Sequence, residues 1–295
     1  MKEKAYAKIN LYLHICGKTT NNYHLINSLM CFVDLYDVIE AENYDGIKIV
    51  GCDIPQKENL VYKVVAKLQE YIQREHEKFV GAKIKLTKNI PIGAGLGGGS
   101  ADAAATLRLL PKLWGVKIPD EIIHKIASEL GSDIVACVVS KPVIATGTGN
   151  DISAVDIDLK DYFIVLVNPM EEVSTPQVYA KYGEENLKSI CENEVCISFE
   201  KPKLDCNIDI NSKSGLEVIK TIKKAHNALQ DPAIEILPKI VDILMDFEKQ
   251  RGCLISRMSG SGATCFGIFE NHKKAENTAD IMRKKYGWAV VAKFV

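Results

Sequence analysis

The stretch PIGAGLGGGS, residues 91–100, is the most informative segment of this chain. It contains five glycines in seven residues and lies between a strand-like pattern and an alanine-rich helical pattern. Glycine adopts backbone conformations that other residues avoid, so the turn is expected to be tight and to expose its amide groups. The start of the next helix adds unpaired N–H groups and the positive end of the helix dipole. The sequence therefore predicts a phosphate-binding loop, in which Ser100 caps the helix or reaches a metal-bound phosphate oxygen.

Three other interpretations of this loop are weaker. A Walker A loop would end in Gly-Lys-Ser or Gly-Lys-Thr, and this loop has no lysine. The dinucleotide pattern Gly93-x-Gly95-x-x-Gly98 is present, with Asp120 at a suitable separation. However, Asp120 follows a proline and opens a second helical pattern, so the required second parallel strand is missing. A flexible linker is disfavoured because structured patterns border the loop on both sides.

The N-terminal half alternates strand and helix patterns around this loop. Apolar and polar residues alternate over residues 5–15, which predicts a half-buried strand with Lys8 and Asn10 on one face, about 7 Å apart. Residues 82–88 form a second strand pattern. Helices are predicted at residues 58–72, at 101–113 and from Pro119 to Gly131, after which Ser132 and Asp133 are placed to cap the next element.

The C-terminal half begins with a buried strand pattern at residues 163–167. Residues 181–214 are polar and weakly periodic, and are expected to be partly loop. One helix is predicted at residues 233–247, followed by a strand at 263–269, a helix at 273–286 and a strand at 288–295. Asn227 is a candidate structural cap. Residues 259–262, Ser-Gly-Ser-Gly, form either a tight turn or a second group of exposed backbone amides.

Composition narrows the possible classes of function. The 295 residues carry a net charge of −1 and are 47% hydrophobic and 25% charged, which is typical of a globular protein and not of a nucleic-acid-binding one. The nine cysteines show no metal-ligand spacing and are expected to be reduced thiols of a cytoplasmic protein. No apolar run is long enough to span a membrane, and Lys8, Asn10 and His14 interrupt any secretory signal at the N-terminus.

Three segments, residues 5–13, 91–105 and 259–267, resemble the three motifs of the GHMP kinases (galactokinase, homoserine, mevalonate and phosphomevalonate kinases). The resemblance implies an α+β fold with a ribosomal-protein-S5-like N-terminal domain over residues 1–155 and a ferredoxin-like C-terminal domain over residues 156–295. It also implies ATP and Mg²⁺, and a cleft between the domains where ATP meets the acceptor. The form of the loop, together with Tyr23-His24, resembles the family member whose acceptor is cytidine diphosphate methylerythritol, phosphorylated on its 2-hydroxyl for isoprenoid synthesis. A monomer or weak homodimer is expected, without nucleic-acid or membrane partners.

The resemblance also implies roles for individual residues. Lys8 and Asp133 would be catalytic, Asn59 would lie by the nucleotide, and Asn10 would help to bind the acceptor. Tyr23 and His24 would hold the cytidine, with Tyr179 stacking on the cytosine. Two departures occur: Asn21-Asn22 stands where the family usually has Asp-Gly, and Asp133-Ile134-Val135 where it has Asp-Val-Pro. The residues that would wrap the ATP phosphates are Pro91, Ile92, Gly93, Ala94, Gly95, Leu96, Gly97, Gly98, Gly99, Ser100 and Ala101.

The expected chemistry is phosphoryl transfer, which requires mainly positioning and charge stabilisation. A carboxylate can take the proton of the acceptor hydroxyl, and a lysine can stabilise the negative charge that develops. From the residues alone, Asp133 is equally well interpreted as a helix cap, Lys8 as a solvated surface lysine and Tyr179 as a core residue. Two alternative functions stay open: another GHMP kinase, of the mevalonate or homoserine type, and a nucleotide-binding module without catalysis.

Overall fold

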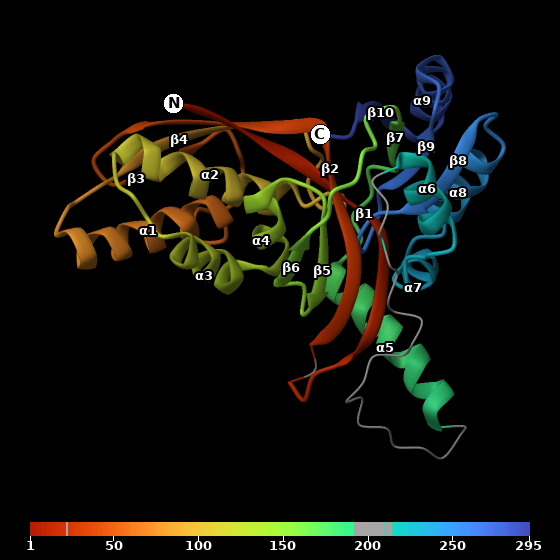
Figure 1. Ribbon diagram of the computed structural model, residues 1–295, viewed down its shortest axis with the longest axis horizontal. Coiled ribbons are helices and arrows are strands. Elements are labelled where there is room, and N and C mark those ends of the chain that lie inside the picture. The colour runs from red at the N-terminus through yellow and green to blue at the C-terminus, as the bar shows by residue number, and fades with distance from the viewer. Residues whose placement is uncertain (22, 192–209, 211–213) are drawn as a thin grey trace. The chain divides into compact units, whose positions relative to one another are not determined.

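The computed structural model describes residues 1–21, 23–191, 210 and 214–295, and its contacts divide the chain into two compact units. Unit 1 comprises Met1–Lys8, Leu35–Ile92 and Gly97–Lys141, and unit 2 comprises Ile9–Asp34, Gly93–Leu96 and Pro142–Val295. The first two strands, β1 (Lys2–Lys18) and β2 (His24–Asn43), therefore contribute residues to both units (Figure 1). The glycine loop is likewise shared. The domain boundary at residue 155 stays a prediction.

Unit 1 contains the strand pairings that precede the glycine loop. The second part of β2 pairs antiparallel with β4 (Ala82–Thr87), and β3 (Ile47–Val50) pairs parallel with β4. On β4, Ala82, Ile84 and Leu86 are buried while the residues between them are more exposed, as the alternating pattern predicts.

Four helices complete unit 1: α1 (Leu60–His76), α2 (Gly98–Trp114), α3 (Asp120–Leu130) and α4 (Ser132–Val139). Helix α2 contacts both α1 and α4, and the small side chains of Ala103, Ala104 and Ala105 are fully buried along it. In Figure 1 these helices lie on one side of β2, β3 and β4. The predicted helices are confirmed. Helix α2 is followed directly by α3, which confirms that the loop does not open a dinucleotide-binding βαβ unit.

Two predictions, for α4 and for β1, were wrong. Asp133 does not cap a helix: α4 begins at Ser132 after Gly131, which leaves Asp133 in the first helical turn with its carboxylate available for another partner. Strand β1 was expected to be half-buried, but every residue from Ala7 to His14 is buried. Polar residues of β1 are tolerated there because they find polar partners, such as the Ser28 hydroxyl, which accepts a hydrogen bond from Asn10 at 2.8 Å.

Unit 2 contains a short antiparallel group of strands and a four-stranded antiparallel sheet. The first part of β2 pairs with β5 (Val143–Gly147), which pairs with β6 (Asp151–Ala154). The sheet has the order β10-β7-β9-β8, formed by β7 (Phe163–Asn168), β8 (Cys253–Met258), β9 (Cys265–Phe269) and β10 (Trp288–Lys293). The first of these strands thus lies between the fourth and the third, which is the ferredoxin-like arrangement that was expected.

The helices of unit 2 are α5 (Thr175–Cys191), α6 (Gly215–Lys223), α7 (Gln230–Ile236), α8 (Lys239–Glu248) and α9 (His272–Tyr286). The single helix predicted at residues 233–247 is in fact two, because Pro238 lacks an N–H group and stands where α8 begins. Of the predicted partial loop at residues 181–214, the start belongs to α5, while residues 192–209 and 211–213 lie outside the described part. Every helix that the structure describes is too short or too polar to cross a bilayer.

Candidate active site

Lys8 and Asp133, which are far apart in sequence, form an ion pair in unit 1. The Lys8 Nζ lies 2.8 Å from Asp133 Oδ2. The Lys8 side chain is only 4% exposed, whereas that of Asp133 is 35% exposed. Strand β1 supplies the lysine and the first turn of α4 supplies the carboxylate. The pair therefore presents an open carboxylate backed by a buried ammonium, an arrangement that can accept a proton and stabilise negative charge.

The end of the glycine loop lies against this ion pair. Gly97 has a φ of +65°, and a Cβ added there would lie 3.2 Å from Lys8 Cε and 3.9 Å from Asp133 Oδ2. Its carbonyl accepts a hydrogen bond from the Ala101 N–H at 2.8 Å, which starts α2. Glycine suits this position because its φ is positive and because a Cβ would crowd the Lys8 side chain. Unit 1 thus holds the charged pair and the first turn of α2 side by side.

The preceding part of the loop, Gly93–Leu96, packs on the turn at residues 259–262 in unit 2. A Cβ on Gly95, which has a φ of +72°, would lie 2.6 Å from the carbonyl oxygens of both Ser259 and Gly262. The Ser259 hydroxyl donates to the Gly95 carbonyl at 3.2 Å, and the Thr264 N–H donates to the Ala94 carbonyl at 3.2 Å. Of the two interpretations of the Ser-Gly-Ser-Gly segment, the tight turn is confirmed by the Gly262 N–H, which donates to the Ser259 carbonyl at 3.0 Å. An anion-binding role for its amides stays a prediction.

Asn10 lies close to the same turn. Its backbone N–H donates to the Ser259 hydroxyl at 3.2 Å, and its side-chain amide donates to the Ser28 hydroxyl. The side chain is buried, and the Ser28 hydroxyl in turn donates to the Tyr12 carbonyl. Asn10 is therefore fixed between β1, β2 and the turn.

Aromatic side chains gather around His24 in unit 2. Its ring centroid lies 5.0 Å from that of Tyr179 and 5.9 Å from that of Tyr182, in an edge-on contact. The stacking of Tyr179 on a cytosine stays a prediction. Burial, together with the nearby Lys18, lowers the pKa of His24 below its usual value, which favours the neutral ring near pH 7. Tyr23 is 68% exposed, so its ring is accessible to a ligand. The departure at Asn22 lies outside the described residues.

Sequence reasoning did not single out Tyr182. Tyr179 and Tyr182 are three residues apart on α5, and residues with this spacing share one face of a helix. That spacing was the available signal. It remained ambiguous because nothing in the sequence indicated that this face of α5 meets the start of β2.

Asn59 has a local structural role in unit 1. Its side-chain oxygen accepts a hydrogen bond from the Val61 N–H at 2.9 Å and caps α1, while its amide group contacts the Cys52 sulfur at 3.1 Å. The position beside the nucleotide stays a prediction.

A buried charged cluster that the sequence did not reveal joins the two segments on either side of the loop in unit 1. Lys88 donates to Asp37 and, at 2.6 Å, to Asp102 in α2. Asp37 also accepts hydrogen bonds from the Asn89 and Ile90 N–H groups, just before the loop. Burial raises the pKa of Asp102 to about 7, against the attraction of Lys88. Burial alone would lower the pKa of Lys88, but attraction to both carboxylates outweighs it, and that pKa is raised.

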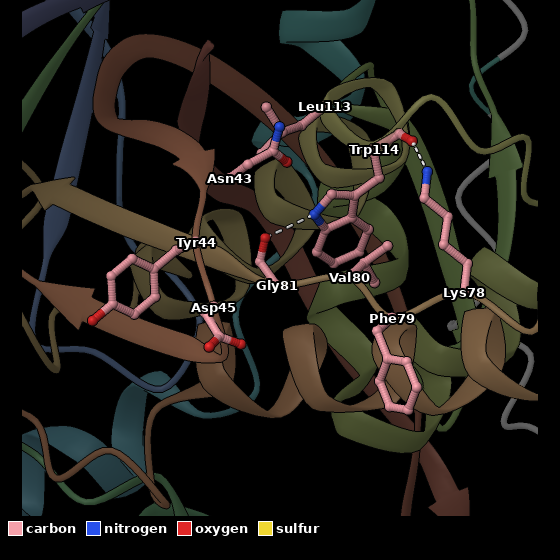
Figure 2. A pocket seen from close by; sticks show the side chains of 9 residues that line it. All are labelled: Asn43, Tyr44, Asp45, Lys78, Phe79, Val80, Gly81, Leu113 and Trp114. Carbon is pink, nitrogen blue, oxygen red and sulfur yellow. Dashed lines mark hydrogen bonds between the residues drawn. The ribbon is translucent and has the colours of Figure 1, made fainter.

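Figure 2 shows a pocket of unit 1 that contains none of the predicted site residues. Its volume is about 510 Å³. The Trp114 indole donates to the Gly81 carbonyl at 3.0 Å, and Lys78 donates to the Trp114 carbonyl at 2.8 Å, so two of its polar contacts are internal. Across the described residues, no three His, Cys, Asp or Glu side chains are grouped as a metal site. The lining residues are Asn43, Tyr44, Asp45, Lys78, Phe79, Val80, Gly81, Leu113 and Trp114.

Comparison with known proteins gives a consistent result. Residues 59–141 match the model of the GHMP kinase N-terminal domain, and residues 213–287 match that of the GHMP kinase C-terminal domain. A 4-diphosphocytidyl-2-C-methyl-D-erythritol kinase of Wolbachia sp. subsp. Brugia malayi is 35% identical, with 96% of this chain and 93% of that protein covered. The protein of the same name in Ehrlichia ruminantium (strain Gardel) is 37% identical, with 92% and 90% covered.

Solved structures agree with the sequence relatives. A crystal structure of 4-(cytidine 5'-diphospho)-2C-methyl-D-erythritol kinase superimposes with a TM-score of 0.78 and 25% identity, covering 100% of this chain and 99% of that one. Homoserine kinase from Cytophaga hutchinsonii shares the fold, with a TM-score of 0.68 and 16% identity. Since two domain models and full-length relatives converge, the chain belongs to the GHMP kinase family.

Proposed function

We propose that this kinase transfers the γ-phosphoryl group of ATP to the 2-hydroxyl of 4-diphosphocytidyl-2-C-methyl-D-erythritol, in the non-mevalonate route to isoprenoid precursors. The relatives that match over nine-tenths or more of the chain carry the name of that enzyme. The observation that carries the chemistry is the Lys8–Asp133 pair, with its 2.8 Å separation and its contact with Gly97.

The two charged residues have complementary roles in this proposal. Asp133, whose carboxylate is partly exposed, accepts the proton of the acceptor hydroxyl as its oxygen attacks the γ-phosphorus. The bond between that phosphorus and the bridging oxygen of ADP breaks, and ADP leaves with the electron pair. Lys8, held 2.8 Å from Asp133, offsets the negative charge that develops on the transferred group.

The glycine loop and the N-terminus of α2 bind the triphosphate. Glycines 93, 95 and 97 all have positive φ angles, which a loop uses to direct successive amides toward one anion. The Ser100 hydroxyl lies in the first turn of α2 and can bond a phosphate oxygen or a metal bound to one. Mg²⁺ would enter as the ATP complex, bound chiefly to phosphate oxygens, where it neutralises their charge.

Aromatic and polar groups of unit 2 recognise the acceptor. A neutral His24 ring carries one donor and one acceptor nitrogen, which suits the polar edge of a cytosine. The exposed ring of Tyr23 and the ring of Tyr179, which lies beside His24, supply the stacking surfaces. Asn10 holds the methylerythritol portion.

The six cysteines that the structure describes with their side chains are free thiols. Thiols persist in a reducing compartment, so we place the enzyme in the cytoplasm. A monomer or weak homodimer that interacts with neither nucleic acid nor membrane completes the proposal.

A coupled assay of ADP release tests this function. Wild-type protein is expected to release ADP with the cytidine substrate and not with mevalonate or homoserine, and free cytidine 5'-diphosphate should compete. Lys8→Met and Asp133→Asn should lower turnover by about 10²–10⁴-fold, the usual contribution of a positioned proton acceptor and charge. Lys67→Met is a matched control, because Lys67 forms an exposed ion pair with Glu129 in the same unit and should retain full turnover.

The outcomes separate the alternatives. Turnover with mevalonate or homoserine in place of the cytidine substrate would establish another GHMP kinase. ATP binding without any ADP release would establish a nucleotide-binding module. Full turnover in folded Lys8→Met protein would remove that lysine from the mechanism.

A further inference from the structure

Asn227 holds the turn that supports the glycine loop. Its side chain is buried, with 5% of its surface exposed. The carboxamide nitrogen donates to the carbonyls of both Met258 and Gly260, at 2.9 and 2.8 Å. The carboxamide oxygen accepts a hydrogen bond from the Leu229 N–H at 3.0 Å. Both donor hydrogens are therefore used to fix the two sides of Ser259.

The backbone beside Asn227 is attached to β1. The Leu13 N–H donates to the His226 carbonyl at 3.1 Å, and the Ala228 N–H donates to the Leu13 carbonyl at 2.8 Å. Asn227 thus forms an isolated parallel β-bridge with Leu13 of β1, the strand that also contains Asn10. Because two backbone hydrogen bonds fix its position, its carboxamide has little freedom to follow a displaced turn.

The turn at residues 259–262 contacts the glycine loop within unit 2. Ser259 and Thr264 donate to the carbonyls of Gly95 and Ala94, and Gly95 approaches so closely that no Cβ would fit. Any shift of the turn must therefore move this part of the loop or break its hydrogen bonds.

We infer that Asn227 is a positioning residue for ATP. It acts through the turn at residues 259–262 and fixes the amides of Gly93–Leu96 in the orientation that binds the triphosphate. The inference rests on the proposed function, in which this loop binds ATP. It goes beyond a capping role, which the contact with Leu229 satisfies on its own.

The experiment uses Asn227→Asp, which keeps the size of the side chain but replaces the donor nitrogen by an oxygen facing two carbonyls. Asn227→Ser, which retains a single hydroxyl donor, is the milder second variant. Asn271→Ala is the control for stability: Asn271 caps α9 in the same unit through the Lys274 N–H at 3.0 Å and does not contact the turn. ATP dissociation constants are measured by calorimetry, KM values for both substrates by ADP release, and melting temperatures by circular dichroism.

The expected result is a weakening of ATP binding by about 10-fold or more in Asn227→Asp, since each lost or repulsive buried hydrogen bond costs a factor of that order. Asn227→Ser should weaken ATP binding less, and the KM for the cytidine substrate should change by less than a factor of about two in either variant. Asn271→Ala should lower the melting temperature and leave both KM values unchanged.

Three outcomes would overturn the inference. One is unchanged ATP affinity in folded Asn227→Ser or Asn227→Asp protein. Another is an equal rise in both KM values that accompanies a lower melting temperature in the Asn227 variants. The third is a wild-type protein that binds no ATP, which would overturn the proposed function as well. Wild-type protein that binds ATP without releasing ADP would overturn the proposed function alone, and the dissociation constants would still decide the role of Asn227.

Discussion

Replacing Gly95 by alanine tests how tightly the glycine loop is held by its neighbours in unit 2. A Cβ at this position would lie 2.6 Å from two carbonyl oxygens, whereas ordinary contact begins near 3.4 Å, so the backbone must move by about 0.8 Å. The left-handed conformation, with a φ of +72°, adds a strain of about 1–2 kcal/mol for an L-residue. Overpacking adds about 1–3 kcal/mol. If the loop relaxes instead of the whole fold, this energy appears as lost ATP affinity of about 30-fold or more.

Gly115→Ala is the matched control for this change. Gly115 ends α2 with a φ of +63°, and a Cβ added there would meet nothing within 4 Å. It therefore carries the backbone strain without the close approach. Urea unfolding and calorimetric ATP titration of both variants isolate the contact contribution, and we expect only Gly95→Ala to lose ATP affinity. Equal unfolding free energies in the two variants, together with unchanged ATP affinity, would refute the close packing of Gly95 on the turn.

Three further predictions follow from the site. Since the pKa of Asp102 is raised to about 7 in the folded protein, the native state retains a proton that the unfolded state has lost, and folding stability declines as pH rises from about 4 to 7. Asp102→Asn should remove this decline. The stability of the variant relative to wild type, measured by urea unfolding, should therefore be greater at pH 7.5 than at pH 5. The same stability difference at both pH values would contradict the buried charge. Tyr182→Ala should raise the KM for the cytidine substrate by about 3- to 10-fold and leave the KM for ATP unchanged, because the edge contact with His24 contributes about 1 kcal/mol. Tyr182→Phe should stay close to wild type. Equal effects on both KM values would argue against a role of Tyr182 at the cytidine site. Because the pKa of His24 is lowered, the KM for the cytidine substrate should be constant above pH 7 and rise only in more acidic solution. His24→Gln should abolish that rise. A rise that begins above pH 7 would contradict a neutral His24 ring.

Local patterns predicted the elements around the glycine loop well. The alternating residues of β4 and the apolar stripe of α1, with Val61, Val64 and Leu68 buried, are determined by nearest neighbours along one element. The glycine loop combines such local signals and was identified for the same reason.

The errors arose where a local pattern and a distant contact compete. The apolar spacing of residues 233–247 suits a single helix, but Pro238 ends the hydrogen-bond ladder and two helices result. Strand β1 shows strict alternation, yet its polar face is buried because Lys8 and Asn10 find partners on other elements. Strand β8, which contains Arg257, was not predicted, since a buried arginine weakens the apolar pattern.

The candidate site shows the same difference between local sequence signals and contacts among distant residues. Local motifs identified the loop, but the roles of Lys8 and Asp133, and their proximity, were expected only from the family resemblance. The roles of Asn227 and of the Asp37–Lys88–Asp102 cluster depend on hydrogen bonds between residues remote in sequence, and periodicity carries no information about such pairs. These hydrogen bonds became visible only with the fold.

The central claim is that Lys8 and Asp133 act on the transferred phosphoryl group and not on ATP binding. Single-turnover transfer of the ³²P-labelled γ-phosphoryl group to the cytidine substrate, at saturating ATP, tests it most directly. We predict that Asp133→Asn slows transfer by about 10²–10⁴-fold while the ATP dissociation constant stays within a factor of about three. An unchanged transfer rate in this variant, or a loss explained entirely by weaker ATP binding, would contradict the claim.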